Sequence, residues 1–431
     1  NGDASLVTNY PDAIPGDEAF TTSRVSLSER DTRDTNAYGG FDLTRGFGER
    51  LFRRIQFGAK LRELTRTRDS LKGTASTGDL ALSGFSGNRG VQTSWDTASW
   101  TLVDMAAIDD VVQASPIDWE QNLLNEHDIE QRIGAGYVQA DFRVERDESR
   151  LFAGNLGARL VRTETWIDGY QDLGEGPTPV SLKTSYSDFL PSFNMRMRLA
   201  DRAAIIAGIA RVMTRPPFND LAPGVRFNLS DKTAKSGNPE LLPFRANQFV
   251  VEAAWAPFRG MRLNGNVTYR DVKNFFAIGE ETVEIDDDTY LLTRPVNGDD
   301  GSILSAGFRY QQNLRRWSRH LRDFALSVAF THNSSSTDFR DPVSGERLPL
   351  PNTAEHVVKT SINYGRDRFG ARLRYQRRGK SLKSSFSDSG LAVWNQPSDS
   401  VDLNFGWRLK GGAQLGLNVR NLFNDGRVQT T

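Results

Sequence analysis

The fold is decided by a short stretch near the end of the chain, residues 401–409, which reads Val-Asp-Leu-Asn-Phe-Gly-Trp-Arg-Leu. Its apolar residues stand at every second position, and they are Val401, Leu403, Phe405, Trp407 and Leu409. Successive side chains of a β-strand point to opposite faces, whereas a helical pattern repeats every 3.6 residues. The stretch is therefore predicted to be a strand with one apolar face and one polar face.

The same alternation recurs along the chain. It is found in Ile55, Phe57, Ala59 and Leu61; in Val138, Ala140, Phe142 and Val144; in Phe193, Met195, Met197 and Leu199; and in Phe249, Val251, Ala253 and Trp255. Counting such segments predicts roughly 16 to 18 strands of about 10 residues each. The chain is therefore predicted to be all-β.

The connections between these segments are alternately short and long. Short polar turns are expected at 146–149, 200–202, 257–260, 365–368 and 410–412, and long connections at roughly 67–130, 215–245, 279–300, 333–353 and 378–398. A large antiparallel transmembrane β-barrel has short periplasmic turns and long extracellular loops, which is this arrangement. A barrel of this size is too wide to be filled by its own side chains.

Aromatic residues gather at the short turns. Trp255 and Phe258 flank one turn, Tyr364 and Phe369 flank another, and Trp407 precedes a third. Aromatic girdles mark the two membrane–water interfaces of outer-membrane barrels. The alternative is that aromatic residues are simply common in strands.

Composition excludes several classes of protein. The chain of 431 residues has 54 Lys+Arg and 54 Asp+Glu, so it lacks the basic excess of a nucleic-acid-binding protein. Its mean hydropathy of -0.51 and its lack of a long apolar run exclude a membrane-spanning helix. The absence of Cys excludes disulfides, thiolate metal sites and a cysteine nucleophile.

Several motifs resemble one known family. They are Ile133–Asp141, Gly154–Glu164, Phe189-Leu-Pro-Ser-Phe-Asn-Met-Arg196, Val212–Pro216, Asp220-Leu-Ala-Pro223, Gly237-Asn-Pro-Glu-Leu-Leu-Pro243, Leu350-Pro-Asn-Thr353 with His356, and Asn418–Asn424. In this order and spacing they resemble the barrel portion of a TonB-dependent outer-membrane receptor of the proteobacterial kind, over about 130–425.

The resemblance implies a bacterial outer-membrane location and contact with the lipid bilayer. It also implies TonB-dependent active uptake of a scarce nutrient, either a ferric siderophore or an oligosaccharide, with the inner-membrane TonB complex as partner. Such receptors carry a plug domain and a TonB box before the barrel, and neither is recognisable in 1–431. We therefore expect a single barrel domain, truncated at both ends, with the plug outside it. Two alternatives remain open, a passive porin-like channel and a secreted β-rich binding protein.

No enzymatic constellation is recognisable. His127, His320, His332 and His356 lack zinc-ligand spacing, and no nucleophile elbow or phosphate-binding loop is present. Asp286–Asp288, Asp299 and Asp300 are expected to be solvated, and the basic cluster Arg315–His320 to be a polar connection at the rim. We therefore expect no enzyme activity, no metal site and no cofactor.

The candidate ligand-binding residues are aromatic and arginine side chains in the long connections. Aromatic faces stack on sugar rings or aryl groups, and arginine binds carboxylates or other anionic oxygens. The candidates are Trp95, Trp100, Trp119, Tyr170, Arg226, Tyr290, Arg294, Arg340 and Trp394. The alternative is that these side chains fold the loops onto one another.

Overall fold

The computed structural model describes residues 21–48, 51–81, 86–89, 101–103, 116–145, 151–172, 176–228, 231–285, 288–341, 343–384, 392–409, 411–423, 426 and 428–430. The chain forms two compact units. The first comprises Asn1–Arg33 and Thr67–Glu126, and the second comprises Asp34–Arg66 and His127–Thr431. Strands β1 and β2 pass through both units.

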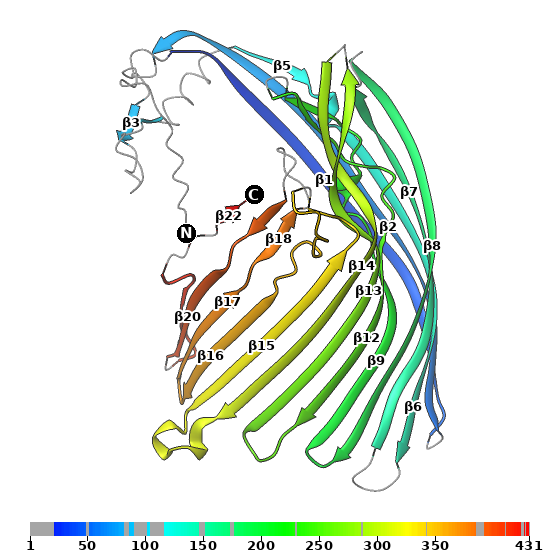
Figure 1. Ribbon diagram of the computed structural model, residues 1–431, viewed down its shortest axis with the longest axis vertical. Coiled ribbons are helices and arrows are strands. Elements are labelled where there is room, and N and C mark those ends of the chain that lie inside the picture. The colour runs from blue at the N-terminus through cyan, green and yellow to red at the C-terminus, as the bar shows by residue number, and fades with distance from the viewer. Residues whose placement is uncertain are drawn as a thin grey trace. The chain divides into compact units, whose positions relative to one another are not determined.

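The second unit is built on one long antiparallel sheet (Figure 1). Its strands follow one another in chain order from β1 to β21, and each pairs with the next strand of the sheet. The strands are β1 (Thr21–Gly46), β2 (Phe52–Ala81), β6 (His127–Glu145), β7 (Leu151–Asp172), β8 (Pro177–Ala200), β9 (Ala203–Thr214), β12 (Phe244–Trp255), β13 (Met261–Ile285), β14 (Asp288–Asn313), β15 (Phe324–Thr337), β16 (His356–Arg366), β17 (Phe369–Arg378), β20 (Ser398–Arg408) and β21 (Gln414–Val419). Within the described part of the chain, no pairing joins β21 to β1.

The register of the sheet segregates apolar from polar side chains. Leu373 of β17 lies opposite Leu403 of β20, and Phe405 lies opposite Leu417 of β21. The alternate positions pair Arg372 with Asn404. Residues opposite each other in an antiparallel ladder share a face, so one face is apolar and the other polar. Leu373, Phe405 and Leu417 are among the exposed large hydrophobic residues, as the lipid-facing wall of a barrel requires.

One end of this sheet carries the short turns (lower edge of Figure 1). Described short turns join β8 to β9, β12 to β13 and β16 to β17, at three of the predicted places. Gly260 of the second turn has φ +89°, a conformation that glycine adopts without strain. The turn expected at Arg146–Ser149 lies outside the described residues.

The turn-side aromatic residues are in contact with one another. The rings of Phe369 and Trp407 stack with their centroids 5.2 Å apart, and those of Phe324 and Tyr364 are 4.9 Å apart. Trp255 is 54% exposed. These are the positions at which the sequence predicts a girdle.

Most strands are longer than the predicted ten residues, and one expected loop is a hairpin. β13 and β14 are 25 and 26 residues long and remain paired to Ile285 opposite Asp288. The expectation of a long irregular connection over 279–300 is therefore wrong. The strict apolar alternation ends where a strand leaves the lipid-facing band, but the backbone ladder continues with β-favouring Thr, Val, Tyr and Leu.

The first unit contains shorter elements. Its strands β3 (Ser86–Arg89) and β4 (Thr101–Val103) pair with each other, and β5 (Ile117–Gln121) pairs with the Leu71–Ala75 part of β2. A 3₁₀ turn, η3, follows at Leu123–Asn125.

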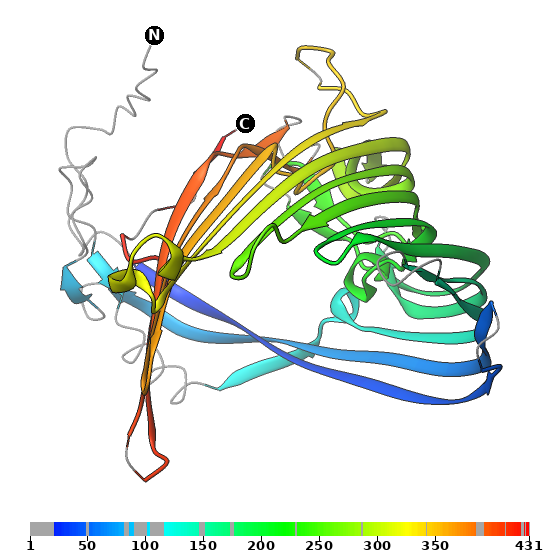
Figure 2. The same cartoon turned by 90° about the horizontal axis from the view of Figure 1, so that it is seen from below.

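Figure 2 turns the molecule by 90° and shows the middle strands of the second unit, from green to orange, still side by side. Among the described residues, no helix combines the length and the apolar character needed to cross a membrane. The helical elements of the second unit are α2 (Phe218–Leu221), η4 (Leu314–Arg316) and η5 (Arg319–Leu321).

Candidate ligand-binding site

The connection between β9 and β12 packs against the polar face of the sheet. Leu221 of α2 and Leu241 form a buried cluster with Ile129 of β6 and Ile167 of β7. Both isoleucines are 0% exposed, although they alternate with polar residues on their strands. The apolar side chains on the polar face are therefore covered by this connection.

A corner at Gly237 fixes the path of this connection. The Gly237 amide donates to the Ala222 carbonyl at 3.1 Å, and the Asn238 amide donates to the Asp220 carbonyl at 2.6 Å. A Cβ atom on Gly237 would lie 2.3 Å from the Ala222 oxygen, so only glycine fits. This backbone contact joins the two sequence motifs at Asp220–Pro223 and Gly237–Pro243.

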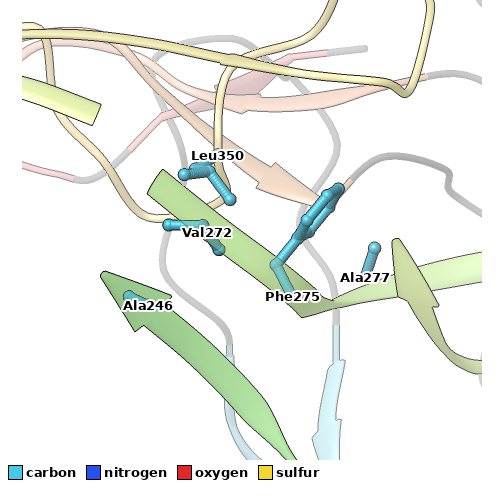
Figure 3. Close-up of a cluster of buried hydrophobic side chains, with 5 residues drawn as sticks. All are labelled: Ala246, Val272, Phe275, Ala277 and Leu350. Atoms are coloured by element: carbon cyan, nitrogen blue, oxygen red, sulfur yellow. The ribbon is translucent and has the colours of Figure 1, made fainter. Parts of the chain in front are cut away.

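The connection between β15 and β16 also folds onto this face. Its Leu350 joins a buried cluster with Ala246, Val272, Phe275 and Ala277 of β12 and β13 (Figure 3). The first connection thus packs against β6 and β7, and the second packs against β12 and β13. These apolar contacts hold both connections against the sheet at the loop-bearing end.

A small sheet extends from the β13–β14 hairpin. β10 (Arg226–Asn228) pairs with β11 (Thr233–Lys235), and β11 lies parallel to β14. Tyr290 is only 5% exposed, because it packs with Val225, Ala234 and Leu292 in the core of this extension. Its ring face is therefore covered.

Two cations lie side by side on the other face of the extension. Arg226 and Lys235 are directly opposite each other in the β10–β11 ladder, and both are exposed. Their side chains lie on the same face of the ladder, because residues directly opposite each other in an antiparallel pair share a face. This pair, Arg226 and Lys235, is called the cation pair below.

Two ion pairs lie elsewhere in the extension. Lys232 bonds to Asp288 at 2.5 Å, and Asp288 raises the pKa of Lys232 through this hydrogen bond. Arg294 contacts Glu281 at 3.1 Å across the hairpin. Both ion pairs are exposed to solvent, where such pairs contribute little to stability.

Near the short turns, the second unit contains a hollow of about 710 Å³ lined by many cationic side chains. Arg196, Arg198, Arg262 and Arg309 contribute to it from three strands and Arg202 from a turn, with Asp201 and Glu252 as counter-charges. This arrangement provides a polar, positively charged wall.

The other predicted candidates are dispersed. Trp95 and Trp100 lie outside the described residues, and Trp119 is 41% exposed on β5 of the first unit. Tyr170 is half-buried on β7 near its hairpin with β8. Arg340 donates to the Gly345 carbonyl at 2.8 Å within its own loop. Trp394, on β19 (Val393–Asn395), lies 4.2 Å from Lys380 in a cation–π contact. Among the candidates that the structure describes, Arg226, Tyr290 and Arg294 lie in or beside the same β10–β11–β14 extension.

Sequence reasoning missed three arrangements. Lys235 beside Arg226 depends on the β10–β11 register. Asp188 and Arg245 form a buried ion pair across strands distant in sequence. His332 and His356 lie opposite each other on β15 and β16 with Glu355 beside them, although their spacing in the sequence is not that of a metal motif. Only pairing the strands in register would have revealed them.

Where the structure describes them, residues of the acidic and basic clusters form ordinary ion pairs and a cation–π contact within the protein. Asp288 pairs with Lys232 and Asp300 with Lys273, while Asp286 lies outside the described residues. Arg316, in η4 of the β14–β15 turn, lies 4.3 Å from the ring of Phe258. That placement fits the expected polar connection at the rim.

Comparison with solved structures finds barrels of similar fold. The unliganded ferric citrate transporter FecA matches with a TM-score of 0.55 at 10% identity, covering 94% of this chain and 51% of that one. The ferric-catecholate import receptor Fiu from K12 E. coli matches at 0.52 and 14% identity, covering 93% and 57%. The siderophore receptor PiuA from Acinetobacter baumannii matches at 0.56 and 12% identity, covering 92% and 52%. The chain spans little more than half the length of these proteins.

No curated protein matches the chain in sequence. The family model described as TonB dependent receptor-like, beta-barrel, matches residues 1–422. The alternating strands, the segregated faces and the anchored connections agree with that match. The chain belongs to the TonB-dependent receptor β-barrel family.

Proposed function

We propose that this chain is the barrel wall of an outer-membrane receptor that takes up an anionic metal chelate, such as a ferric siderophore, with energy from the inner-membrane TonB complex. The cation pair carries this proposal, because Arg226 and Lys235 share one exposed face of the β10–β11 ladder. Arginine and lysine bind anionic oxygens through charge-assisted hydrogen bonds. A neutral oligosaccharide has no anionic oxygen with which two adjacent cations could form ion pairs.

The polar wall supports the same choice. Arg196, Arg198, Arg262 and Arg309 line the hollow near the short turns, so an anion that enters at the loop-bearing end meets further positive charge along the sheet. Two proteins of similar fold are named as a ferric citrate transporter and a ferric-catecholate import receptor. The proposed role is transport rather than catalysis.

Binding to the full-length protein in detergent tests the proposal. The double variant Arg226→Gln/Lys235→Gln should bind ferric citrate or a ferric catecholate at least about 10-fold more weakly, because charged hydrogen bonds contribute about 1.5–3 kcal/mol. Arg319→Gln, an exposed arginine on the turn side, is the matched control. Tighter binding of a neutral maltooligosaccharide than of either chelate would overturn the choice of ligand.

Uptake by cells tests the energy source. Accumulation of the labelled chelate should require TonB in the host cell. A large constitutive ion conductance of the full-length protein in planar bilayers would instead support a passive porin-like channel, and fractionation away from the outer membrane would support a secreted binding protein.

A further inference from the structure

Two histidines meet at the loop-side border of the apolar face. His332 of β15 and His356 of β16 are directly opposite in the antiparallel ladder, and their Nδ1 atoms are 3.2 Å apart. Phe330 and Val358 form the next pair on the same face, toward the short turns. The stretch from Phe324 to His332 is about 27 Å long at ~3.4 Å per residue, or about 21 Å along the membrane normal for a strand tilted by about 40°, so it spans most of an apolar band about 25 Å tall. The histidines therefore lie at the loop-side edge of this band.

A carboxylate determines which nitrogen of His356 is available. Glu355 Oε1 lies 3.1 Å from Nε2 of His356, within ion-pair distance, so the carboxylate favours the tautomer of His356 that is protonated on this nitrogen. The lone pair then resides on Nδ1, which points toward His332. A carboxylate hydrogen-bonded to the far nitrogen is the usual outer partner of a metal-binding histidine.

The separation of the two Nδ1 atoms suits a shared metal ion. Zinc binds imidazole nitrogen at about 2.0–2.1 Å, which places two ligands of a tetrahedral ion about 3.4 Å apart. The rings are inclined by 27° with centroids 4.8 Å apart, so one ring must turn about its Cβ–Cγ bond to converge on the ion. His356 is about half exposed, which leaves room for that turn.

The surroundings leave the outer side of the pair open. Ala306 of β14 flanks His332, and Gly379 donates its backbone amide to the His356 carbonyl. Small residues on both sides leave space for water ligands. The nearby cations are engaged elsewhere, since Lys380 lies over Trp394 and Arg377 contacts Asp399 at 3.3 Å.

We propose that His332 and His356 bind one divalent transition-metal ion through their Nδ1 atoms, with Glu355 positioning His356. The site takes zinc, copper or nickel, which imidazole nitrogen suits, and it does not take calcium or magnesium, which require oxygen ligands. It lies on the apolar side of the sheet, separate from the cation pair, and stands whether or not the proposed uptake is correct. The bound ion would join β15 to β16 at the interface.

Zinc titration of the full-length protein in detergent tests the site. The folded protein should bind one zinc ion that calcium and magnesium do not displace, and either His332→Gln or His356→Gln should abolish saturable binding. Glu355→Gln should weaken binding about 10–100-fold, as expected for loss of an outer partner. His320→Gln, which removes an exposed histidine from the β14–β15 turn, should leave binding unchanged.

Copper(II) electron paramagnetic resonance supplies an independent readout. Hyperfine splitting from two nitrogens is expected for the unaltered protein and should be absent from either histidine variant. Unchanged zinc affinity in both histidine variants, or a hydrogen-bonded histidine pair that binds no zinc at all, would overturn the proposal. Migration of the folded barrel on unheated gels verifies that each variant retains the native sheet.

Discussion

Nε of Arg245 lies 2.5 Å from Oδ1 of Asp188, and the Asp188 side chain is 1% exposed. The two residues come from β12 and β8, which both pair with β9. Tyr186 lies under the guanidinium, 5.9 Å from it. The Asp188 carboxylate is deeply buried and the Arg245 side chain is 17% exposed, so removing either partner leaves a largely buried charge without its nearest counter-charge.

We predict that Asp188→Ala and Arg245→Ala each lower the free energy of unfolding by about 3–5 kcal/mol. The double variant should lose less than the sum of the two. Urea unfolding in detergent measures these losses. Arg143→Ala, which removes an exposed ion pair with Glu145, should cost no more than about 1 kcal/mol. Equal losses at the two sites would contradict the burial argument.

Gly237→Ala should destabilise the β9–β12 connection, because the added Cβ would meet the backbone oxygens of Ala222 and Asp220 at 2.3 and 2.8 Å. Overpacking of this kind costs about 1–3 kcal/mol. Limited proteolysis and urea unfolding should both report the change. Gly365→Ala is the matched control, since nothing lies within 4 Å of its added Cβ. A variant at Gly237 that is as stable as the control would exclude a tight corner.

Leu373→Arg should cost about 2–4 kcal/mol in lipid vesicles, because Leu373 lies in the middle of the apolar face and arginine is costly at the bilayer midplane. Ser334→Arg, on the same face beyond His332, should cost about 0–1 kcal/mol. Reversible unfolding from vesicles gives both values. Similar costs at the two positions would mean that this face does not border lipid.

The loop tip at Asp341 should loosen in acid. The Asp341 carboxylate accepts hydrogen bonds from the Val343 and Ser344 amides at 2.9 and 2.8 Å, and the Ser344 bond contributes most to lowering its pKa below 3.8. A carboxyl group with a lowered pKa stabilises the fold above its unfolded value, and the contribution disappears as pH falls through the lower folded value.

Acid-active pepsin should therefore cleave this loop increasingly as the pH falls below about 3.8, relative to cleavage elsewhere in the chain. Asp341→Asn keeps an acceptor oxygen without the titrating charge, so its relative cleavage should vary little with pH. The same pH dependence in both proteins would assign the effect to another group.

The sequence by itself determined the strands and their two faces. Residues such as Leu373, Phe405 and Trp407 obey a period of two that is local, and the short turns contain their own polar and glycine residues. Local rules also placed the aromatic residues at the turn end. One of the motifs that identify the family contains a corner where backbone atoms approach too closely for a Cβ atom, at Gly237, whereas others, such as 133–141 and 154–164, lie within β6 and β7.

Only the tertiary structure decided which distant residues meet. Register between strands brought His332 to His356 and Arg226 to Lys235, and the inward folding of two connections buried Ile129, Ile167 and Leu350. The apolar period could not show that β13 and β14 extend past the band, because backbone hydrogen bonds continue where apolar selection ends. Tyr290 looked like a ligand-facing aromatic in sequence, but packing covers its ring. Alternation is encoded residue by residue, whereas contacts depend on long-range pairing that no single stretch of sequence contains.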